Sequence, residues 1–118
     1  MAESLAPRER IRKKKDFLVL YRKGYRYRSP YFNLIGLSSA LAYSRVGVVA
    51  SRKVGNAVAR NKAKRWMRDL FRRNKELLRS PVDLLIVASA AIREATWTEL
   101  EESYFQGVGK IVEKKRVR

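Results

Sequence analysis

The sequence has 118 residues, of which 46% are hydrophobic, and these figures indicate one folded domain with a modest core rather than a disordered chain. Its 28 Lys and Arg residues against 11 Asp and Glu give a net charge of +17, which predicts a polyanionic partner: nucleic acid, an anionic membrane or an acidic protein. The chain has no cysteine and no histidine, which excludes disulfides, thiolate metal sites and every catalytic arrangement that needs an imidazole or a thiol.

A membrane is the least favoured of these partners. The longest apolar run, residues 82–92, contains Asp83 and is far shorter than the roughly 20 residues that a membrane-spanning helix needs. The basic N-terminus is not followed by an apolar stretch of signal-peptide length. Together with the absence of cysteine, these features predict a cytoplasmic protein that does not act on a membrane.

The chain is expected to form a single domain over residues 1–118, in which residues 1–9 are a flexible lead-in. Residues 16–23 are predicted to form a short helix, because Phe17 and Tyr21 share one face of it with a leucine between them. A glycine follows directly, and glycine commonly ends a helix. The domain therefore begins with a helix that presents aromatic side chains.

Two main strands are predicted after this helix. Residues 31–37 (YFNLIGL) and 45–51 (RVGVVAS) are rich in the aromatic and β-branched residues that favour strands. Residues 38–44 connect them, in a position that suits a hairpin loop. Residues 25–27 are predicted to add a short edge strand.

The second half of the chain predicts a helix, a strand and a further helix. Asn56 is a suitable N-cap for a helix that runs to about Leu78, where a Ser-Pro pair ends it. Residues 82–88 (VDLLIVA) form a nearly continuous apolar run, which is typical of a strand buried on both faces. The last helix begins at a capping box from Thr96 to Glu99. This order of elements predicts an α+β fold, a small α/β sandwich with N- and C-terminal helices.

The region from Arg52 to Lys75 carries ten basic residues and one acid, Asp69. On a helix with about 100° per residue, the apolar side chains share one arc and the cations fill the opposite arc. The apolar arc holds Ala59, Ala63, Trp66, Met67, Leu70, Phe71 and Leu77. Like charges four residues apart cost stability unless a polyanion neutralises them. The pattern therefore predicts a helix that packs on a sheet and binds nucleic acid.

A second basic cluster, residues 8–28, carries ten further Lys and Arg residues among aromatic side chains. These aromatic residues are Phe17, Tyr21, Tyr25, Tyr27 and Tyr31. Exposed aromatic rings can stack on unpaired bases while cations hold the phosphates, which favours RNA over duplex DNA. The alternative is that Phe17 and Tyr21 belong to the core.

The central basic motif resembles the signature of the bacterial ribonuclease P protein subunit. Residues 45–58 (RVGVVASRKVGNAV) are similar to the family's strand ending in Ser-Lys-Lys-Val-Gly, and residues 60–68 to its helical pattern Arg-Asn-Arg-x-Lys-Arg-x-x-Arg. The resemblance extends over about residues 8–112. Arg52 and Lys62 stand where the family usually has Lys and Arg; both keep the charge, but Lys62 lacks the planar fork of a guanidinium group.

The resemblance implies a mostly antiparallel sheet with one parallel pair of strands, joined by a left-handed crossover through the basic helix. It also implies a subunit of ribonuclease P that binds the catalytic RNA and the 5′ leader of precursor tRNA, and promotes endonucleolytic removal of that leader. The Mg²⁺ ions would be held mainly by the RNA subunit. No catalytic residue, metal ligand, organic cofactor or small-molecule substrate is then expected in the protein.

Two sets of site residues follow from the resemblance. The set expected to bind the RNA subunit is Arg52, Arg60, Asn61, Lys62, Lys64, Arg65, Arg68 and Arg72. The set expected to bind the single-stranded leader in a central cleft is Phe17, Tyr21, Asn33, Ile35, Ser51, Lys53 and Ala57. At the position of Ile35 the family often has an aromatic residue.

Two other functions stay open at this point. A ribosomal or other structural RNA-binding protein would share the composition, and the basic motif after its strand argues against it. A nuclease acting without an RNA subunit would need a carboxylate cluster for metal ions. The densest acids, Glu99, Glu101 and Glu102, lie in the first turn of a predicted helix, where they compensate its dipole.

Overall fold

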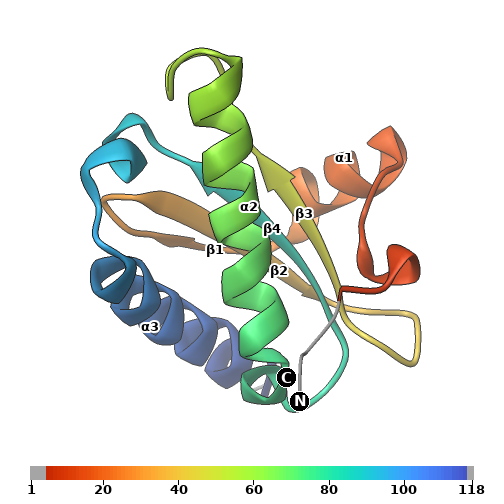
Figure 1. Ribbon diagram of the computed structural model, residues 1–118. Coiled ribbons are helices and arrows are strands. Elements are labelled where there is room, and N and C mark those ends of the chain that lie inside the picture. Colours follow the sequence, from red (N-terminus) through yellow and green to blue (C-terminus); the bar gives the residue numbers. More distant parts are fainter. Residues whose placement is uncertain (1–4, 117–118) are drawn as a thin grey trace.

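The computed structural model describes residues 5–116 (Figure 1). Its elements are η1 (Pro7–Glu9), α1 (Lys14–Lys23), β1 (Tyr25–Arg28), β2 (Phe32–Ser38), β3 (Arg45–Val49), α2 (Ala57–Arg73), η2 (Lys75–Leu78), β4 (Val82–Ala88), η3 (Ala90–Glu94) and α3 (Trp97–Arg116). The strands form one sheet in the order β1-β2-β4-β3, in which β3 and β4 are parallel and the other neighbours antiparallel. The predicted α+β fold with one parallel pair is confirmed.

Helix α2 connects the parallel strands β3 and β4, which are neighbours in the sheet. In Figure 1, α2 lies in front of the sheet, and β4 lies to the left of β3 when both strands are followed in chain direction. The crossover is therefore left-handed, as the resemblance implies and against the usual preference for right-handed connections.

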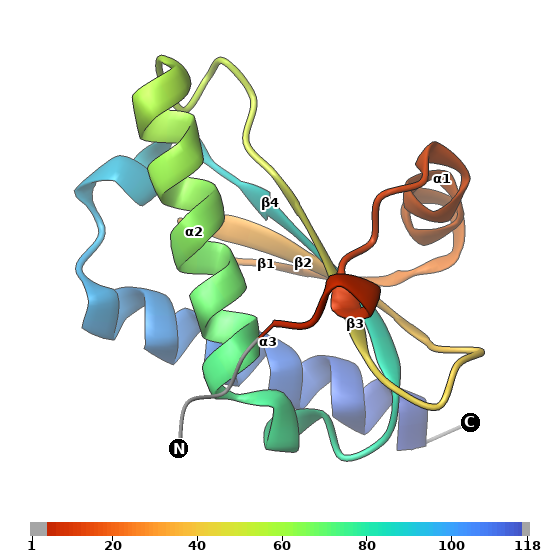
Figure 2. The same ribbon diagram turned by 45° about the vertical axis from the view of Figure 1, so that its right-hand side comes forward.

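The sheet separates two hydrophobic cores of unequal size. Helices α2 and α3 cover one face and α1 lies on the other (Figures 1 and 2). The larger core fills the space between the sheet and α2 and α3, and the smaller one consists of Ile11, Leu20, Ile35 and Leu85 beneath α1. Side chains on both faces of β4 are completely buried, which confirms the prediction for this strand.

The predicted hairpin between the strands at 31–37 and 45–51 is wrong. These segments form β2 and β3, but β4 lies between them and pairs with both. Strand β4 is the most continuously apolar segment of the chain, so an inner position in the sheet buries it on both faces and satisfies its backbone on both edges.

The predicted end of the basic helix at about Leu78 is also wrong. Helix α2 ends at Arg73, because the Asn74 side-chain amide donates a hydrogen bond to the Leu70 carbonyl, 2.8 Å away, and the chain continues as the tighter turn η2. The change of helical period moves Leu78 into the core and leaves Leu77 exposed. Leu77 was predicted on the apolar arc of the helix, so this prediction is wrong.

The N-terminal segment runs along the edge of the sheet. The part of the predicted lead-in at residues 1–4 lies outside the described residues. Within the described part, the Glu9 carboxylate lies 2.9 Å from the Lys75 ammonium group, and Arg10 forms a parallel bridge with Val46 of β3. Ile11 is buried directly after this bridge. Residues 9–11 are therefore fixed between η2 and β3.

Candidate RNA-binding surfaces

The loop between β3 and α2 is a tight turn that exposes its polar residues. The amides of Val54 and Gly55 donate hydrogen bonds of 3.0 and 3.1 Å to the carbonyls of Ser51 and Arg52. Val54 is completely buried, and Gly55 has φ +147°, which favours glycine. This anchoring leaves the side chains of Ser51, Arg52 and Lys53 exposed at the end of the sheet.

The first turn of α2 is capped as predicted. The Asn56 side-chain oxygen accepts a hydrogen bond from the Ala59 amide at 2.9 Å. The Arg60 guanidinium group donates to the Gly55 carbonyl at 3.1 Å, which links the helix to the preceding loop. Arg93 of η3 also reaches this point, because a Cβ atom added to Gly55 would lie 3.2 Å from Arg93 Nη1. No sequence motif singles out Arg93, which joins the site only through the fold.

The outer face of α2 carries the predicted cations. Ala63, Met67, Leu70 and Phe71 are buried on the inner face, as predicted. Asp69, the one acid of the helix, accepts a 2.8 Å hydrogen bond from Arg72 and so is already paired. The predicted RNA-binding residues of this helix lie along one exposed or half-exposed surface: Arg60, Asn61, Lys62, Lys64, Arg65, Arg68 and Arg72.

The positive charge of this surface is not balanced within the protein. Among the ion pairs of the described residues, none involves Lys64, Arg65 or Arg68. Burial, and then the nearby charges of Arg10 and Arg12, lower the pKa of Arg68. The N-terminal segment therefore adds cations to the α2 surface instead of neutralising it.

On the opposite face of the sheet, α1 covers one row of side chains. Ile35, Leu85 and Gly47 are neighbours across β2, β4 and β3. The Phe17 ring lies on Gly47, where an added Cβ atom would come within 2.7 Å of the ring. Ile35, one of the residues expected to bind the leader, is only 1% exposed and supports α1 from below.

The next row of side chains remains partly exposed beside α1. It consists of Arg28, Asn33, Val87 and Val49, which are neighbours across all four strands. We call these four residues the open row. Tyr21 and Phe17 lie on the flank of α1 that faces this row, since the residues of the opposite flank, such as Asp16, contact Arg45 at the other side of the helix.

The five aromatic residues of the basic N-terminal region divide between the two faces of the sheet. Tyr21 is 37% exposed and Phe17 is half-buried, so Phe17 belongs partly to the core and Tyr21 to the surface. The remaining three tyrosines lie toward α3: Tyr27 donates a 3.2 Å hydrogen bond to Gln106, Tyr25 lies beneath Lys114, and Tyr31 packs against the larger core. Of these five rings, Phe17 and Tyr21 therefore lie on the α1 face.

The first carboxylate of α3, that of Glu99, caps the helix. The Glu99 carboxylate accepts a 2.9 Å hydrogen bond from the Thr96 amide, and the Thr96 hydroxyl accepts one of 3.1 Å from the Glu99 amide. The bond from the Thr96 amide lowers the pKa of Glu99. Among the described residues, no three histidines, cysteines or carboxylates are grouped so that they could hold a metal ion. Within the same residues, no helix has the length and apolar character that crossing a membrane requires.

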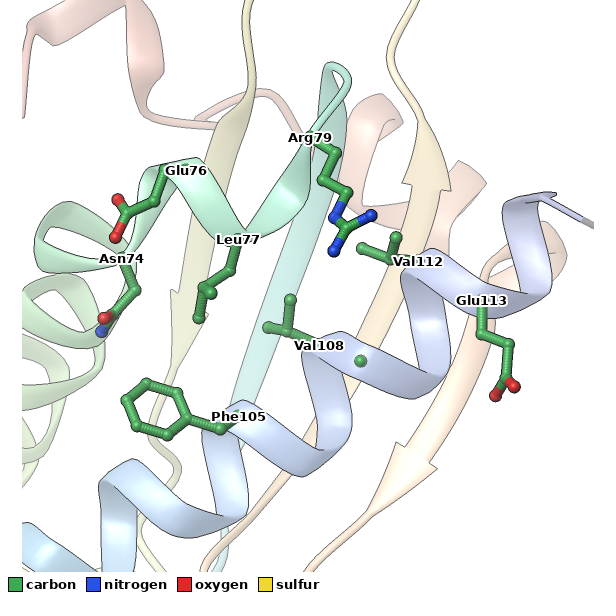
Figure 3. Close-up of a pocket in the computed structure, with 9 residues that line it drawn as sticks. Asn74, Glu76, Leu77, Arg79, Phe105, Val108, Val112 and Glu113 are labelled. Atoms are coloured by element: carbon green, nitrogen blue, oxygen red, sulfur yellow. The ribbon is translucent and has the colours of Figure 1, made fainter.

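A hollow of about 770 Å³ between η2 and α3 lies apart from both predicted sets (Figure 3). Leu77 and Phe105 line it together with Arg79, and none of the residues predicted to bind RNA does. The predicted residues instead lie on two surfaces that meet at the loop between β3 and α2, since Arg52 of one set stands between Ser51 and Lys53 of the other. One consists of the outer face of α2, and the other of the α1 flank with the open row and the loop after β3.

Comparison with known proteins identifies the family. A family model for ribonuclease P matches residues 5–112, which include both surfaces. The ribonuclease P protein component of Thermotoga maritima is 39% identical over 94 residues, 80% of each chain. That of Desulforapulum autotrophicum is 35% identical over 104 residues, 88% of this chain and 89% of the relative.

Solved structures agree with this match. The ribonuclease P protein from Thermotoga maritima superposes with a TM-score of 0.78 at 32% identity, covering 87% of this chain and 97% of that one. The ribonuclease P protein of Staphylococcus aureus gives a TM-score of 0.77 at 28% identity, covering 88% and 97%. The chain therefore belongs to the bacterial ribonuclease P protein component family, and it is the protein subunit of an RNA-containing endoribonuclease that acts in the 5′ maturation of tRNA.

Proposed function

We propose that the outer face of α2 binds the RNA subunit of ribonuclease P, and that the α1 face of the sheet binds the single-stranded 5′ leader of precursor tRNA. The observation that carries this proposal is a row of cations on α2 that take part in no ion pair among the described residues: Arg60, Lys62, Lys64, Arg65 and Arg68. The residues assigned to the RNA subunit are those expected from the sequence, Arg52, Arg60, Asn61, Lys62, Lys64, Arg65, Arg68 and Arg72, with Arg93 added.

Binding by α2 is mainly electrostatic. Each cation that contacts a phosphate releases condensed counterions from the RNA. With six to ten such contacts, raising the salt concentration from roughly 50 to 200 mM should therefore weaken the affinity about a thousandfold or more. The Lys62 ammonium group lies 4.9 Å from the centre of the Trp66 ring, which holds it at the surface beside Arg93. Lys62 supplies a point charge there, without the bidentate geometry of arginine.

The leader site combines a stacking surface with polar groups. The exposed ring of Tyr21, beside Phe17, can stack on an unpaired base, and the Asn33 amide in the open row can hydrogen-bond to a base edge. The Ser51 hydroxyl and Lys53 ammonium group lie at the end of β3. Ala57, the first residue of α2, is small and exposed, so a phosphate can approach the helix N-terminus closely.

The Mg²⁺ ions needed for cleavage belong mainly to the RNA subunit in this proposal. The phosphate oxygens of RNA are the hard ligands that Mg²⁺ prefers. Two of the protein's own carboxylates already serve other groups: Asp83 holds Arg45, and Glu99 caps α3. The protein would neutralise phosphates, so that RNA and substrate assemble at lower Mg²⁺ concentration.

A reconstitution assay tests the function. Cleavage of the 5′ leader from a precursor tRNA is measured at low Mg²⁺ with the protein alone, with a bacterial ribonuclease P RNA alone, and with both. We expect efficient cleavage only in the combined reaction. Cleavage by the protein alone would contradict an RNA-based active site, and tight RNA binding without stimulation would favour a general RNA-binding role.

A matched pair of variants tests the leader site. Tyr21 and Tyr25 are each 37% exposed but lie on opposite faces of the sheet. Tyr21→Ala should weaken holoenzyme binding of leader-containing precursor by about fivefold to a hundredfold, the range for loss of one stacked base, and leave binding of mature tRNA unchanged. Tyr25→Ala should change neither. Equal effects of the two variants would show that Tyr21 is not a leader contact.

A further inference from the structure

Helix α1 lies across the sheet, with a row of strand side chains beside each of its flanks. One flank faces the open row, which is the proposed leader site. The other flank faces a third row of neighbouring side chains, Leu37, Asp83 and Arg45, on β2, β4 and β3. Together with the segment before α1 and the loop after β2, this row lines a hollow of about 550 Å³. We call this hollow the Arg45 groove.

The floor of the Arg45 groove is fixed by a network of ion pairs. Arg45 donates two hydrogen bonds, of 3.0 and 2.7 Å, to the two oxygens of Asp83, and its third nitrogen lies 3.5 Å from Asp16 of α1. The hydrogen bond with Asp83 raises the pKa of Arg45 despite its partial burial. Both acids of the groove are therefore occupied by one arginine, and they do not neutralise the cations at the rim.

Four further cations form the rim of the groove. Arg10, Arg12, Lys13 and Lys15 line the hollow and are exposed. Among the described residues, none of these four takes part in an ion pair. The seven charged residues of the lining are five cations and two acids, so the groove attracts an anion.

The walls of the groove are apolar. Val19 of α1 is 42% exposed and Leu41 of the loop after β2 is 40% exposed, and both line the hollow. A groove with cations at its rim and apolar side chains in its walls suits an unpaired nucleotide, whose phosphate meets the cations while its sugar and base cover apolar surface. A simple inorganic anion would leave these walls exposed to water.

The groove is continuous with the α2 surface. Arg10 is joined to β3 by its bridge with Val46, and the chain continues through Arg12 into the groove. Arg10 and Arg12 also lie close enough to Arg68 for their charges to lower its pKa. One strip of positive charge thus runs from the middle of α2 to the far flank of α1, on the side away from the open row.

We propose that the Arg45 groove binds a second, unpaired segment of the RNA subunit. This inference rests on the proposed contact between α2 and the RNA subunit, because the strip of charge through Arg68 is what assigns the groove to that RNA and not to the leader. It goes beyond that proposal, since none of the rim cations belongs to either set of assigned residues. It also gives the exposed Val19 and Leu41 a ligand.

Site-directed cleavage of the RNA tests the proposal directly. The chain has no native cysteine, so a single substitution places an iron–EDTA probe at one position. Probes at Leu41→Cys, in the groove wall, and at Arg65→Cys, on α2, are compared with a control at Lys110→Cys, which is exposed on α3. We expect backbone cuts in the RNA subunit from Leu41 and Arg65 without precursor tRNA present, and none from Lys110.

The three probes separate the two proposals. Cuts from Arg65 without cuts from Leu41 would overturn the groove proposal and leave the α2 proposal intact. The absence of cuts from both would overturn both. Cuts from Leu41 that appear only in the leader of a bound precursor would assign the groove to the leader, which also contradicts the proposal.

Affinity measurements give an independent test. Lys15→Ala should weaken binding to the RNA subunit by about two- to fivefold near 0.15 M salt, and reduce the slope of log affinity against log salt by roughly 0.7, the value for one single-strand phosphate contact. Lys110→Ala removes the same charge from α3 and should change neither quantity. An equal effect of the two variants would mean that only net charge matters, and this result would overturn the groove as a site.

Discussion

Helices α2 and α3 pack on the same face of the sheet, but they differ in charge: α2 is strongly basic and α3 has no net charge. Met67 and Leu70 of α2 and Leu100 and Tyr104 of α3 are all completely buried. Residues 57–73 of α2 carry seven cations and one acid, whereas residues 97–116 of α3 carry four cations and four acids. The inner faces of both helices are buried in the same core. The difference in charge between the two helices must therefore have another cause.

The helix dipole shows which of the two surfaces is adapted to folding. Acidic residues stabilise the first turn of a helix and basic residues destabilise it. Helix α3 has Glu99 in its first turn within a complete capping box, whereas α2 has no acid in its first turn and has Arg60 directly after it. The first-turn charge of α3 therefore supports its own stability, whereas Arg60 near the start of α2 opposes the dipole of that helix unless an anion is bound.

The largest expected effect concerns the feature that the two helices share. Met67→Ala in α2 and Leu100→Ala in α3 should each lower the free energy of unfolding by about 2–5 kcal/mol, because each removes a completely buried side chain from one core. Urea unfolding measures this loss. A cost well below 1 kcal/mol for one variant would show that its helix is not an equal part of the core.

The next effect separates the two outer faces. Combined Arg65→Ala and Arg68→Ala should weaken binding to the RNA subunit by about 30-fold near 0.15 M salt and reduce the salt slope by about one unit for each residue. The free energy of unfolding should change by less than about 0.5 kcal/mol, since the residues make no ion pair within the described part of the protein. Loss of stability in parallel with affinity would contradict the division of roles.

A smaller effect is expected at the cap of α3. Thr96→Ala removes the hydroxyl acceptor of the Glu99 amide and should cost about 1 kcal/mol of stability without changing RNA affinity. Thr98→Ala, two residues further along the chain and exposed within α3, is the matched control and should have little effect. If the Thr96→Ala variant is fully folded but binds RNA more weakly, α3 belongs to the RNA interface.

The smallest effect is the pH dependence of the same cap. The pKa of Glu99 in the folded protein lies below its ordinary value of 4.5, because its charged form accepts the hydrogen bond from the Thr96 amide. The unfolded chain therefore takes up the proton first, so the contribution of Glu99 is present above pH 4.5 and is lost as the pH falls through the lowered value. Glu99→Gln should make the acid side of the stability curve shallower, which thermal unfolding at a series of pH values measures.

The sequence by itself determined those features that depend on local pattern. The inner face of α2 follows from helical spacing, and its start follows from the cap formed by Asn56. The residue range of β4 follows from one apolar run. The capping box of α3 was predicted for the same reason, since its two hydrogen bonds join residues only three positions apart. The resemblance to a known family supplied the expected site residues.

Only the tertiary structure decided which distant segments meet. The position of β4 between β2 and β3 depends on pairing between segments almost 40 residues apart, which no local period records. The same pairing buries Ile35 under α1, divides the aromatic residues between two faces, and brings Arg93 to Gly55. The Arg45 groove likewise exists only because the sheet register aligns Leu37, Asp83 and Arg45 beside α1. The chemistry of each side chain can be read from the sequence. Which side chains come together to form a binding surface depends on how the whole chain packs.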